Sequence, residues 1–143
     1  RCHEKARTLL GEGVAEGVLR TEYCGQPCQI RLDWLNPERG IVDLKTCNDL
    51  DWVQADGRLY GYAHQMAFYR AVLAQELQHI LVPVYVIAVE KKAPFRVGVG
   101  PVSEDALAVA QRENEAAMRR LKTCQDRQEW PTGYEEMRVF DFM

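Results

Sequence analysis

The stretch of sequence that decides the fold is CQIRLDWLNPERGIVDLKTC, residues 28–47. Two strand-like runs, Cys28–Leu35 and Ile41–Cys47, flank a five-residue segment, Asn36–Gly40, whose Asn, Pro and Gly are typical of turns. In the first run apolar and polar residues alternate, as they do in a strand with one buried face. A short loop between two such runs predicts an antiparallel hairpin.

The segments on either side of this hairpin complete the fold prediction. An earlier strand-like run, Val18–Cys24, is joined to it by the turn signal Gly25-Gln26-Pro27, which predicts a three-stranded antiparallel meander. Residues 3–10 have a short helical pattern. After the meander we expect a helix, two strands and a helix N-capped by Ser103, at Arg58–Leu77, Val82–Glu90, Phe95–Val102 and Glu104–Gln125. The order (α)βββαββα predicts an α/β (α+β) domain, in which helices flank a mixed sheet built around the meander.

The composition is that of an ordinary globular chain of 143 residues. Hydrophobic residues make up 47% of it, and 18 Lys plus Arg against 21 Asp plus Glu give a net charge of −3. This mild acidity argues against a protein that coats nucleic acid by charge alone. No apolar run is long enough to span a membrane. We expect a single domain over residues 1–143. The N-terminus has no hydrophobic leader, and the absence of an initiator Met favours a fragment of a longer protein.

The cysteines give little support to a disulfide framework or a zinc site. There are five of them, an odd number, without a CxxC pair: Cys2, Cys24, Cys28, Cys47 and Cys124. We therefore expect reduced cytoplasmic thiols that pack as small apolar side chains. Cys24 and Cys28 flank a predicted turn, so a disulfide or a shared metal is the alternative for that pair.

The hairpin carries a candidate metal site. Asp43 and Lys45 lie on the same face of their strand, and a symmetric hairpin places Asp33 opposite Asp43 and Arg31 opposite Lys45. Two opposed carboxylates repel each other, and a divalent cation such as Mg²⁺, with the Leu44 carbonyl as a further ligand, removes that conflict. Lys45 would then orient a water or neutralise a phosphate. The alternative, of equal weight, is a solvated sheet face with surface ion pairs.

Two further positions are candidates on weaker grounds. Glu22 joins the same face if the first turn pairs it with Arg31. Gln65 and Tyr69, at i and i+4, share a polar helix face with Arg58 and could bind DNA phosphates or bases. Helical periodicity alone favours an ordinary exposed helix side for that face.

Taken together, these motifs resemble the PD-(D/E)xK nuclease superfamily, in particular its RecB-type and exonuclease VIII-like (RecE-like) phage exonucleases, with lambda exonuclease more distant. The resemblance covers residues 18–131 and rests on Asp33, on the DxK motif Asp43-Leu44-Lys45 with Thr46, on Gln65-Met66-Ala67-Phe68-Tyr69, and on Glu129-Trp130-Pro131.

The resemblance implies a restriction-endonuclease-like core and a Mg²⁺-dependent (or Mn²⁺-dependent) exonuclease that digests linear double-stranded DNA ends. Asp33 and Asp43 would bind the metal, with Leu44 O and, less certainly, Glu22. Lys45 would activate or position the water, and Gln65 and Tyr69 would shape the site. It also implies a bacterial or phage-encoded homo-oligomer that acts in the cytoplasm with a single-strand annealing protein in recombination. The expected DNA contacts are Arg31, Thr46, Trp52 and Arg58.

The sequence departs from the family pattern at three places. Leu32 stands where the family often has Pro before the first Asp, and His64 is displaced by one position from the usual Tyr-His-x-Gln, which favours a flanking or packing role for it. Relatives usually carry helices upstream of the first strand, sometimes with a further ligand. This sequence starts almost at the core, so the resemblance implies a fragment that lacks these upstream N-terminal helices. The alternatives are therefore a catalytically inert DNA-binding or assembly domain and a related endonuclease. An enzyme with a Cys24 or Cys47 nucleophile lacks a neighbouring His in the sequence.

Overall fold

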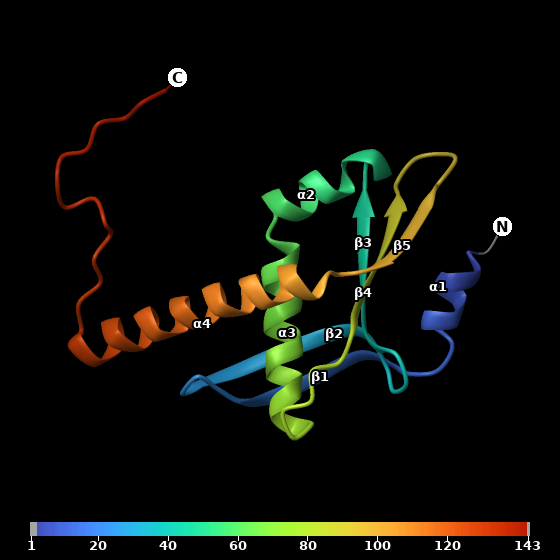
Figure 1. Ribbon diagram of the computed structural model, residues 1–143, viewed down its shortest axis with the longest axis horizontal. Coiled ribbons are helices and arrows are strands. Elements are labelled where there is room, and N and C mark those ends of the chain that lie inside the picture. The colour runs from blue at the N-terminus through green and yellow to red at the C-terminus, as the bar shows by residue number, and fades with distance from the viewer. Residues whose placement is uncertain (1–2, 143) are drawn as a thin grey trace.

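The computed structural model describes residues 3–142, and a five-stranded mixed sheet in the strand order β1-β2-β3-β4-β5 runs through it (Figure 1). β3 and β4 are parallel, and the other neighbours are antiparallel. The elements are α1 (Glu4–Leu9), β1 (Val14–Tyr23), β2 (Gln26–Asn36), β3 (Gly40–Cys47), the 3₁₀ helix η1 (Leu50–Trp52), α2 (Val53–Leu59), α3 (Tyr62–Glu76), β4 (Val84–Glu90), β5 (Val97–Pro101) and α4 (Glu104–Arg127). The predicted succession of the five strands and of the first and last helices is confirmed, and β1, β2 and β3 form the predicted meander.

The turn between β1 and β2 corrects one sequence prediction. It is made by Cys24 and Gly25, whose φ values of 51° and 70° are both positive, as a two-residue hairpin turn requires. This turn pairs Glu22 with Pro27, so the predicted pairing of Glu22 with Arg31 is wrong. Glu22 lies exposed next to the hairpin turn, away from the DxK strand.

The hairpin between β2 and β3 has the predicted register, but its ladder is short. The pairs are Asn36–Gly40, Leu35–Ile41 and Trp34–Val42, and no pairing continues to Asp33 and Asp43 in the described chain. Gly40 is required here, because its φ is 110° and a Cβ would collide with the carbonyl oxygen of Pro83. The separation of β2 from β3 beyond Trp34 opens the sheet beside the DxK motif.

An irregularity in β1 lies opposite Asp33. Glu16 has a φ of 54°, and the ladder passes from Ala15–Trp34 to Gly17–Leu32 without pairing Glu16 and Asp33. Leu32 packs into the core that contains α3, whereas Trp34 packs against the α1 side. The strand therefore changes the faces of its side chains at Asp33, and such local breaks often re-aim a side chain next to a functional site.

The connection from β3 to β4 contains more than the one helix predicted for Arg58–Leu77. It comprises η1, α2 and α3, and α3 begins after Gly61, which is in the left-handed conformation with a φ of 65°. This break turns the chain so that α2 and α3 run in different directions (Figure 1). The first turn of α3 thereby comes to lie near β3, as the contacts of Lys45 described below demonstrate.

Two apolar clusters pack on opposite faces of the sheet. The larger one joins α3 and the start of α4 to the sheet through Ile30, Leu32, Ile41, Met66, Val72, Val84 and Leu107. The smaller one packs α1 against the other face through Leu9, Val42 and Ile87. Because Ile41 faces α3 and side chains alternate along a strand, Asp43 and Lys45 face the same side as α3.

The remaining features concern the last helix and the cysteines. Ser103 caps α4 as predicted, since its hydroxyl accepts a hydrogen bond of 3.2 Å from the Ala106 N–H. Cys24, Cys28, Cys47 and Cys124 are free thiols, and Cys2 lies outside the described residues. Over residues 3–142, none of the helices combines the length and the apolarity that crossing a bilayer requires.

Candidate active site

Lys45 and Asp43 form the centre of the site. Lys45 Nζ lies 2.8 Å from Asp43 Oδ2, and the exposed fractions of the two side chains are 16% and 3%. The strand supplies this arrangement directly, because residues two apart on one strand point to the same face. An ion pair so far removed from solvent differs from the solvated surface pairs that were the alternative.

The polar side of α3 completes the surroundings of Lys45. Its Nζ donates a 2.8 Å hydrogen bond to Gln65 Oε1, and Gln65 Nε2 donates a 3.0 Å bond to the Tyr69 hydroxyl. The i, i+4 spacing places Gln65 and Tyr69 one above the other on the helix. Gln65 and Tyr69 therefore belong to the site through a chain of contacts that begins at Lys45.

Tyr62 is a neighbour of Lys45 that the sequence did not single out. The ring of Tyr62, the first residue of α3, has its centroid 4.7 Å from Lys45 Nζ, a distance typical of a cation–π contact. The ring is also close to Gly57 of α2, where a Cβ would come within 3.3 Å of it. The break between α2 and α3 is what places this ring over the lysine.

Asp33 reaches the site from β2 through the space left by the short ladder. Its Oδ2 accepts a 2.8 Å hydrogen bond from the Leu44 N–H. The N–H and C=O of one strand residue point toward the same neighbouring strand, so the Leu44 carbonyl also points toward the side where β2 has left the ladder. Asp33, Leu44 O and Asp43 thus converge beside β3.

The electrostatics of Asp43 show an incompletely satisfied carboxylate. Burial raises the pKa of Asp43 above its usual range and the neighbouring Asp33 raises it further, whereas Lys45 opposes both effects. Although Lys45 is close, Asp43 Oδ2 is buried and accepts no regular hydrogen bond within residues 3–142. A buried oxygen in this state is suited to a hard cation.

The residues present fit a magnesium or manganese ion. Such ions take oxygen ligands, typically one or two carboxylates together with water and phosphate oxygens. Asp33, Asp43 and the Leu44 carbonyl supply that set. No group of three or more His, Cys, Asp or Glu suited to a metal occurs within the described part of the chain, so the other ligands would be water and substrate.

An ion-pair cluster around Arg96 holds the loop that follows the DxK strand. The guanidinium bonds both oxygens of Glu90 at 2.6 to 3.0 Å and Asp49 Oδ1 at 2.9 Å, and it lies 3.5 Å from Asp51. Glu90 Oε1 also accepts a bond from the Leu50 N–H. This cluster ties the end of β4 to η1, and through it fixes the start of the connection to α3.

We predict that Glu90 makes stability sensitive to acid. Hydrogen bonds from Arg96 and from the Leu50 N–H lower the pKa of Glu90 from 4.5 to about 2. A lowered pKa means that the carboxylate stabilises the fold above pH 4.5 and that this contribution is lost as the pH falls toward 2. In urea unfolding between pH 2 and 7, Glu90→Gln should be less stable at neutral pH and lose less stability in acid. The exposed Glu136→Gln is the control, and parallel curves for wild type and Glu90→Gln would contradict the prediction.

Several predicted DNA contacts are not brought to this centre. Arg31 is not paired with Lys45, because the β2–β3 ladder ends at Trp34, and its guanidinium instead lies 3.1 Å from Glu16. Thr46 points to the opposite face of β3 from Lys45. Trp52 is exposed at the end of η1, and Arg58 is exposed in α2. His64 pairs with Glu113 at 2.6 Å, in keeping with a flanking role.

Sequence reasoning missed three contributors to the site. In the sequence, Tyr62 is the tyrosine of the segment Tyr62-Ala63-His64-Gln65, which was compared with the family's Tyr-His-x-Gln, and nothing there pointed to Lys45. Its contact with Lys45 depends on the break between α2 and α3. The left-handed backbone of Glu16 and the Glu90–Arg96 pair have no local sequence signal. All three act through residues distant in sequence.

Comparison with known proteins places this geometry in context. A family model described as "PDDEXK-like domain of unknown function (DUF3799)" matches residues 2–141. Among solved structures, the crystal structure of a Eubacterium rectale protein named "Putative exonuclease" is similar, with 20% sequence identity and a TM-score of 0.74 over 99% of this chain. The chain spans 58% of that protein's chain. None of the curated proteins matches the sequence. The likeness shows the fold, and the predicted restriction-endonuclease-like architecture is confirmed.

Proposed function

Because the chain belongs to the family of PDDEXK-like domains called DUF3799, we propose that it is a Mg²⁺-dependent DNA exonuclease that hydrolyses phosphodiester bonds at double-stranded ends. The superfamily and the fold support a nuclease. The choice of metal, of DNA ends and of exonucleolytic cleavage is our proposal.

One observation carries the proposal. A buried Asp43 oxygen without a regular hydrogen bond lies 2.8 Å from a lysine that is itself held by Gln65. A charged carboxylate in this environment costs free energy, because its burial is not offset by a full set of hydrogen bonds. An ion pair with a purely structural role would be more stable if both carboxylate oxygens were hydrogen-bonded. The arrangement is suited to a cation and a phosphate that arrive together.

The chain's own residues have distinct roles in this proposal. Asp33 and Asp43, with the Leu44 carbonyl, would hold the cation. When bound, that cation supplies charge stabilisation at the scissile phosphate and lowers the pKa of the attacking water. Lys45 orients that water or donates to a phosphate oxygen, Gln65 fixes the Lys45 ammonium, and Tyr69 fixes Gln65.

We predict that Mn²⁺ or Mg²⁺ raises the melting temperature of the wild-type chain. A ligand that binds only the folded state stabilises it by RT ln(1 + [L]/Kd), so the shift should grow with metal concentration. Asp43→Asn should abolish the shift, since it removes a charged ligand. Asp126→Asn, which removes a carboxylate from the surface of α4, is the matched control.

The absence of any metal-dependent shift in the wild type would contradict the metal site. It would favour the second reading, a catalytically inert DNA-binding or assembly domain with a nuclease fold. That reading would gain further support if the chain bound DNA in EDTA as tightly as it does in Mg²⁺.

Linear and closed circular DNA separate exonuclease from endonuclease. We expect Mg²⁺-dependent loss of linear duplex, with closed circles left intact under the same conditions. Conversion of the circles to nicked or linear forms would instead indicate a related endonuclease. The family resemblance leads us to propose further that the chain acts in the bacterial cytoplasm as a homo-oligomer, together with a single-strand annealing protein, in phage-type recombination.

A further inference from the structure

The ring of Tyr62 covers one side of the Lys45 ammonium. An ammonium has three N–H donors, and two oxygens, Asp43 Oδ2 and Gln65 Oε1, each lie 2.8 Å from Nζ. The Tyr62 ring lies over Nζ with its centroid 4.7 Å away, so the charge meets the electron-rich face of the ring. Lys45 is therefore held by a carboxylate, an amide and an aromatic ring.

The chain around Tyr62 fixes the position of this ring. Gly61, whose φ is 65°, breaks the helical path immediately before Tyr62, which begins α3. A Cβ at Gly57 of α2 would come within 3.3 Å of Tyr62 Cδ2, so the smallest residue stands where the ring packs against α2. The ring of Tyr60 stacks on that of Tyr62 at an interplanar angle of 26°, with the centroids 6.2 Å apart. The ring thus has supports that are independent of Lys45.

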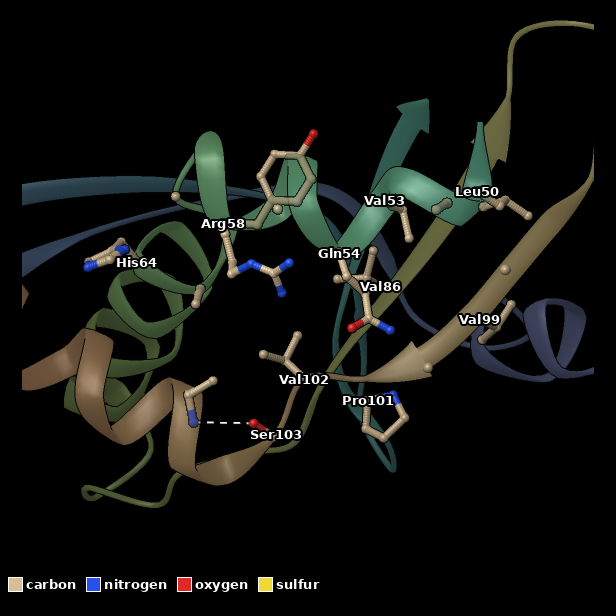
Figure 2. Close-up of a pocket in the computed structure, with 18 residues that line it drawn as sticks. Leu50, Val53, Gln54, Arg58, His64, Val86, Val99, Pro101, Val102 and Ser103 are labelled. Atoms are coloured by element: carbon tan, nitrogen blue, oxygen red, sulfur yellow. Dashed lines mark hydrogen bonds between the residues drawn. The ribbon is translucent and has the colours of Figure 1, made fainter. Parts of the chain in front are cut away.

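The same ring separates Lys45 from a half-open cleft of about 810 Å³. The cleft lies between α2, the starts of α3 and α4, and the strands β4 and β5, and Figure 2 shows Arg58 and Gln54 extending into it from α2. Tyr62 belongs to its lining, whereas Lys45 does not. The Lys45 side chain is accordingly only 16% exposed, although the cleft is next to it. The ring therefore keeps the water of the cleft away from that side of the ammonium.

A neutral ring is suited to hold Lys45 when Asp43 is engaged elsewhere. Once Asp43 binds a cation, its carboxylate attracts Lys45 less strongly, and the like charges of the cation and the ammonium repel each other. The attraction between an ammonium and the face of a ring does not depend on that carboxylate. Without the ring, only the Gln65 amide would hold the ammonium, and a long lysine side chain would regain rotamer freedom.

We propose that Tyr62 is a positioning residue, which keeps the Lys45 ammonium aimed at the scissile phosphate while Asp43 is engaged with the cation. The inference rests on the proposed nuclease function and adds to it a role for a side chain that does not itself touch the reacting atoms. The Tyr62 hydroxyl takes part in no hydrogen bond within residues 3–142. The face of the ring, and not the hydroxyl, is therefore the functional group.

Phenylalanine and leucine at position 62 separate the aromatic face from apolar bulk. Tyr62→Phe keeps the face and should cleave an end-labelled linear duplex in Mg²⁺ within about twofold of the wild-type rate. Tyr62→Leu stays apolar but loses the face, and its single-turnover rate should fall about tenfold. Tyr85→Leu is the matched control, because Tyr85 is half-buried in β4 and packs on the α1 side of the sheet. Its rate should stay within about twofold of wild type.

A double-mutant cycle shows whether the effect passes through the ammonium. In a Lys45→Ala background, Tyr62→Leu should change the residual rate by less than about twofold, because the ring has no charge left to hold. If Tyr62→Leu did not fold, Gly57→Ala would take its place in the cycle. Its Cβ displaces the ring while alanine favours the helix, so we expect about a threefold lower rate without a lower melting temperature.

Lysine NMR gives a readout that does not depend on cleavage. Protons above the face of an aromatic ring are shifted upfield, so the ε-methylene protons of Lys45 should be shifted upfield in the wild type and in Tyr62→Phe. Their signal is assigned by its loss in Lys45→Arg. The shift should persist when saturating Ca²⁺ is added, because the ring holds the ammonium independently of Asp43.

Four outcomes would overturn the proposal. In a chain that cleaves DNA with Mg²⁺, equal rates for Tyr62→Leu and Tyr62→Phe would remove the ring from the reaction and leave the nuclease. Equal tenfold losses from Tyr62→Leu with and without Lys45 would mean a purely structural role. Disappearance of the upfield shift in Ca²⁺ would show that Lys45 leaves the ring when the cation binds. A wild-type chain that cuts no DNA would overturn both this proposal and the proposed function.

Discussion

Replacing Lys45 with alanine is expected to lower the rate of Mg²⁺-dependent DNA cleavage by about a thousandfold, within the range for loss of a proton-transfer group or of a donor that stabilises developing charge. Lys45 Nζ contacts Asp43 Oδ2 and Gln65 Oε1, each at 2.8 Å, so its charge is fixed beside the candidate metal ligands. The effect should fall on kcat, because the lost interaction is made chiefly in the transition state. Single-turnover cleavage of an end-labelled duplex measures it.

Two variants make this result specific. Lys91→Ala removes a lysine from the exposed turn between β4 and β5 and should leave the rate within about twofold of wild type. Lys45→Arg keeps the charge but cannot place it at the same point, and we expect it to be nearly as impaired as the alanine variant. If Lys45→Ala retained more than a tenth of the wild-type cleavage rate, Lys45 would have no part in the chemical step.

The largest expected effect on stability comes from Glu104, the first residue of α4. Arg70 of α3 is 2% exposed, and its only ion-pair partner within residues 3–142 is Glu104, at 2.7 Å. Arg70 Nε has no hydrogen-bond partner there, so Glu104 is the main compensation for a buried charge. Glu104→Ala should lower the free energy of unfolding by about 1–3 kcal/mol, because it leaves the buried Arg70 guanidinium without its partner, although the exposed Glu104 carboxylate is partly screened by solvent. Urea denaturation at neutral pH measures the change.

Replacing Arg70 and replacing Glu104 should have unequal effects on stability, and this difference gives the sharper test. Arg70→Met removes the buried charge together with the need for a partner and should cost clearly less than Glu104→Ala. Asp105→Asn removes a carboxylate from the same helical turn, where the helix dipole accounts for about 0.3–1 kcal/mol. Equal losses for Glu104→Ala and Asp105→Asn would mean that the dipole, and not Arg70, explains the effect.

The parts of the site that could be predicted are those set by local rules. The turn Asn36–Gly40 and strand alternation were sufficient for the β2–β3 register and for the shared face of Asp43 and Lys45. Helical spacing was sufficient for Gln65 and Tyr69 to lie together. Each of these relations involves neighbours in a regular element, where geometry follows from periodicity.

The errors arose where a backbone conformation departs from the usual residue preference. Positive φ at Cys24 made a two-residue turn in place of the Gly25-Gln26-Pro27 turn, and the register of Glu22 changed with it. Left-handed φ is uncommon for such residues, and the same is true of Glu16 opposite Asp33. Residue preferences favour the common conformation, so the backbone at Cys24 and Glu16 could not be predicted from them.

Other features depend on contacts between distant segments. The break at Gly61 is compatible with the sequence, but the position of Tyr62 over Lys45 exists only once α3 is packed on the sheet. The sheet beside the catalytic pair needs the parallel pairing of β3 with β4, which joins residues more than 40 positions apart. Local patterns carry no information on such pairings.

The measurement that tests the central claim most directly is the release of label from an end-labelled linear duplex as Mg²⁺ is raised from zero. We predict no release in EDTA, a rate that rises and saturates with Mg²⁺, and loss of that activity in Asp43→Asn. Release that is independent of the metal, or equal for wild type and Asp43→Asn, would contradict a metal-dependent nuclease centred on Asp43 and Lys45.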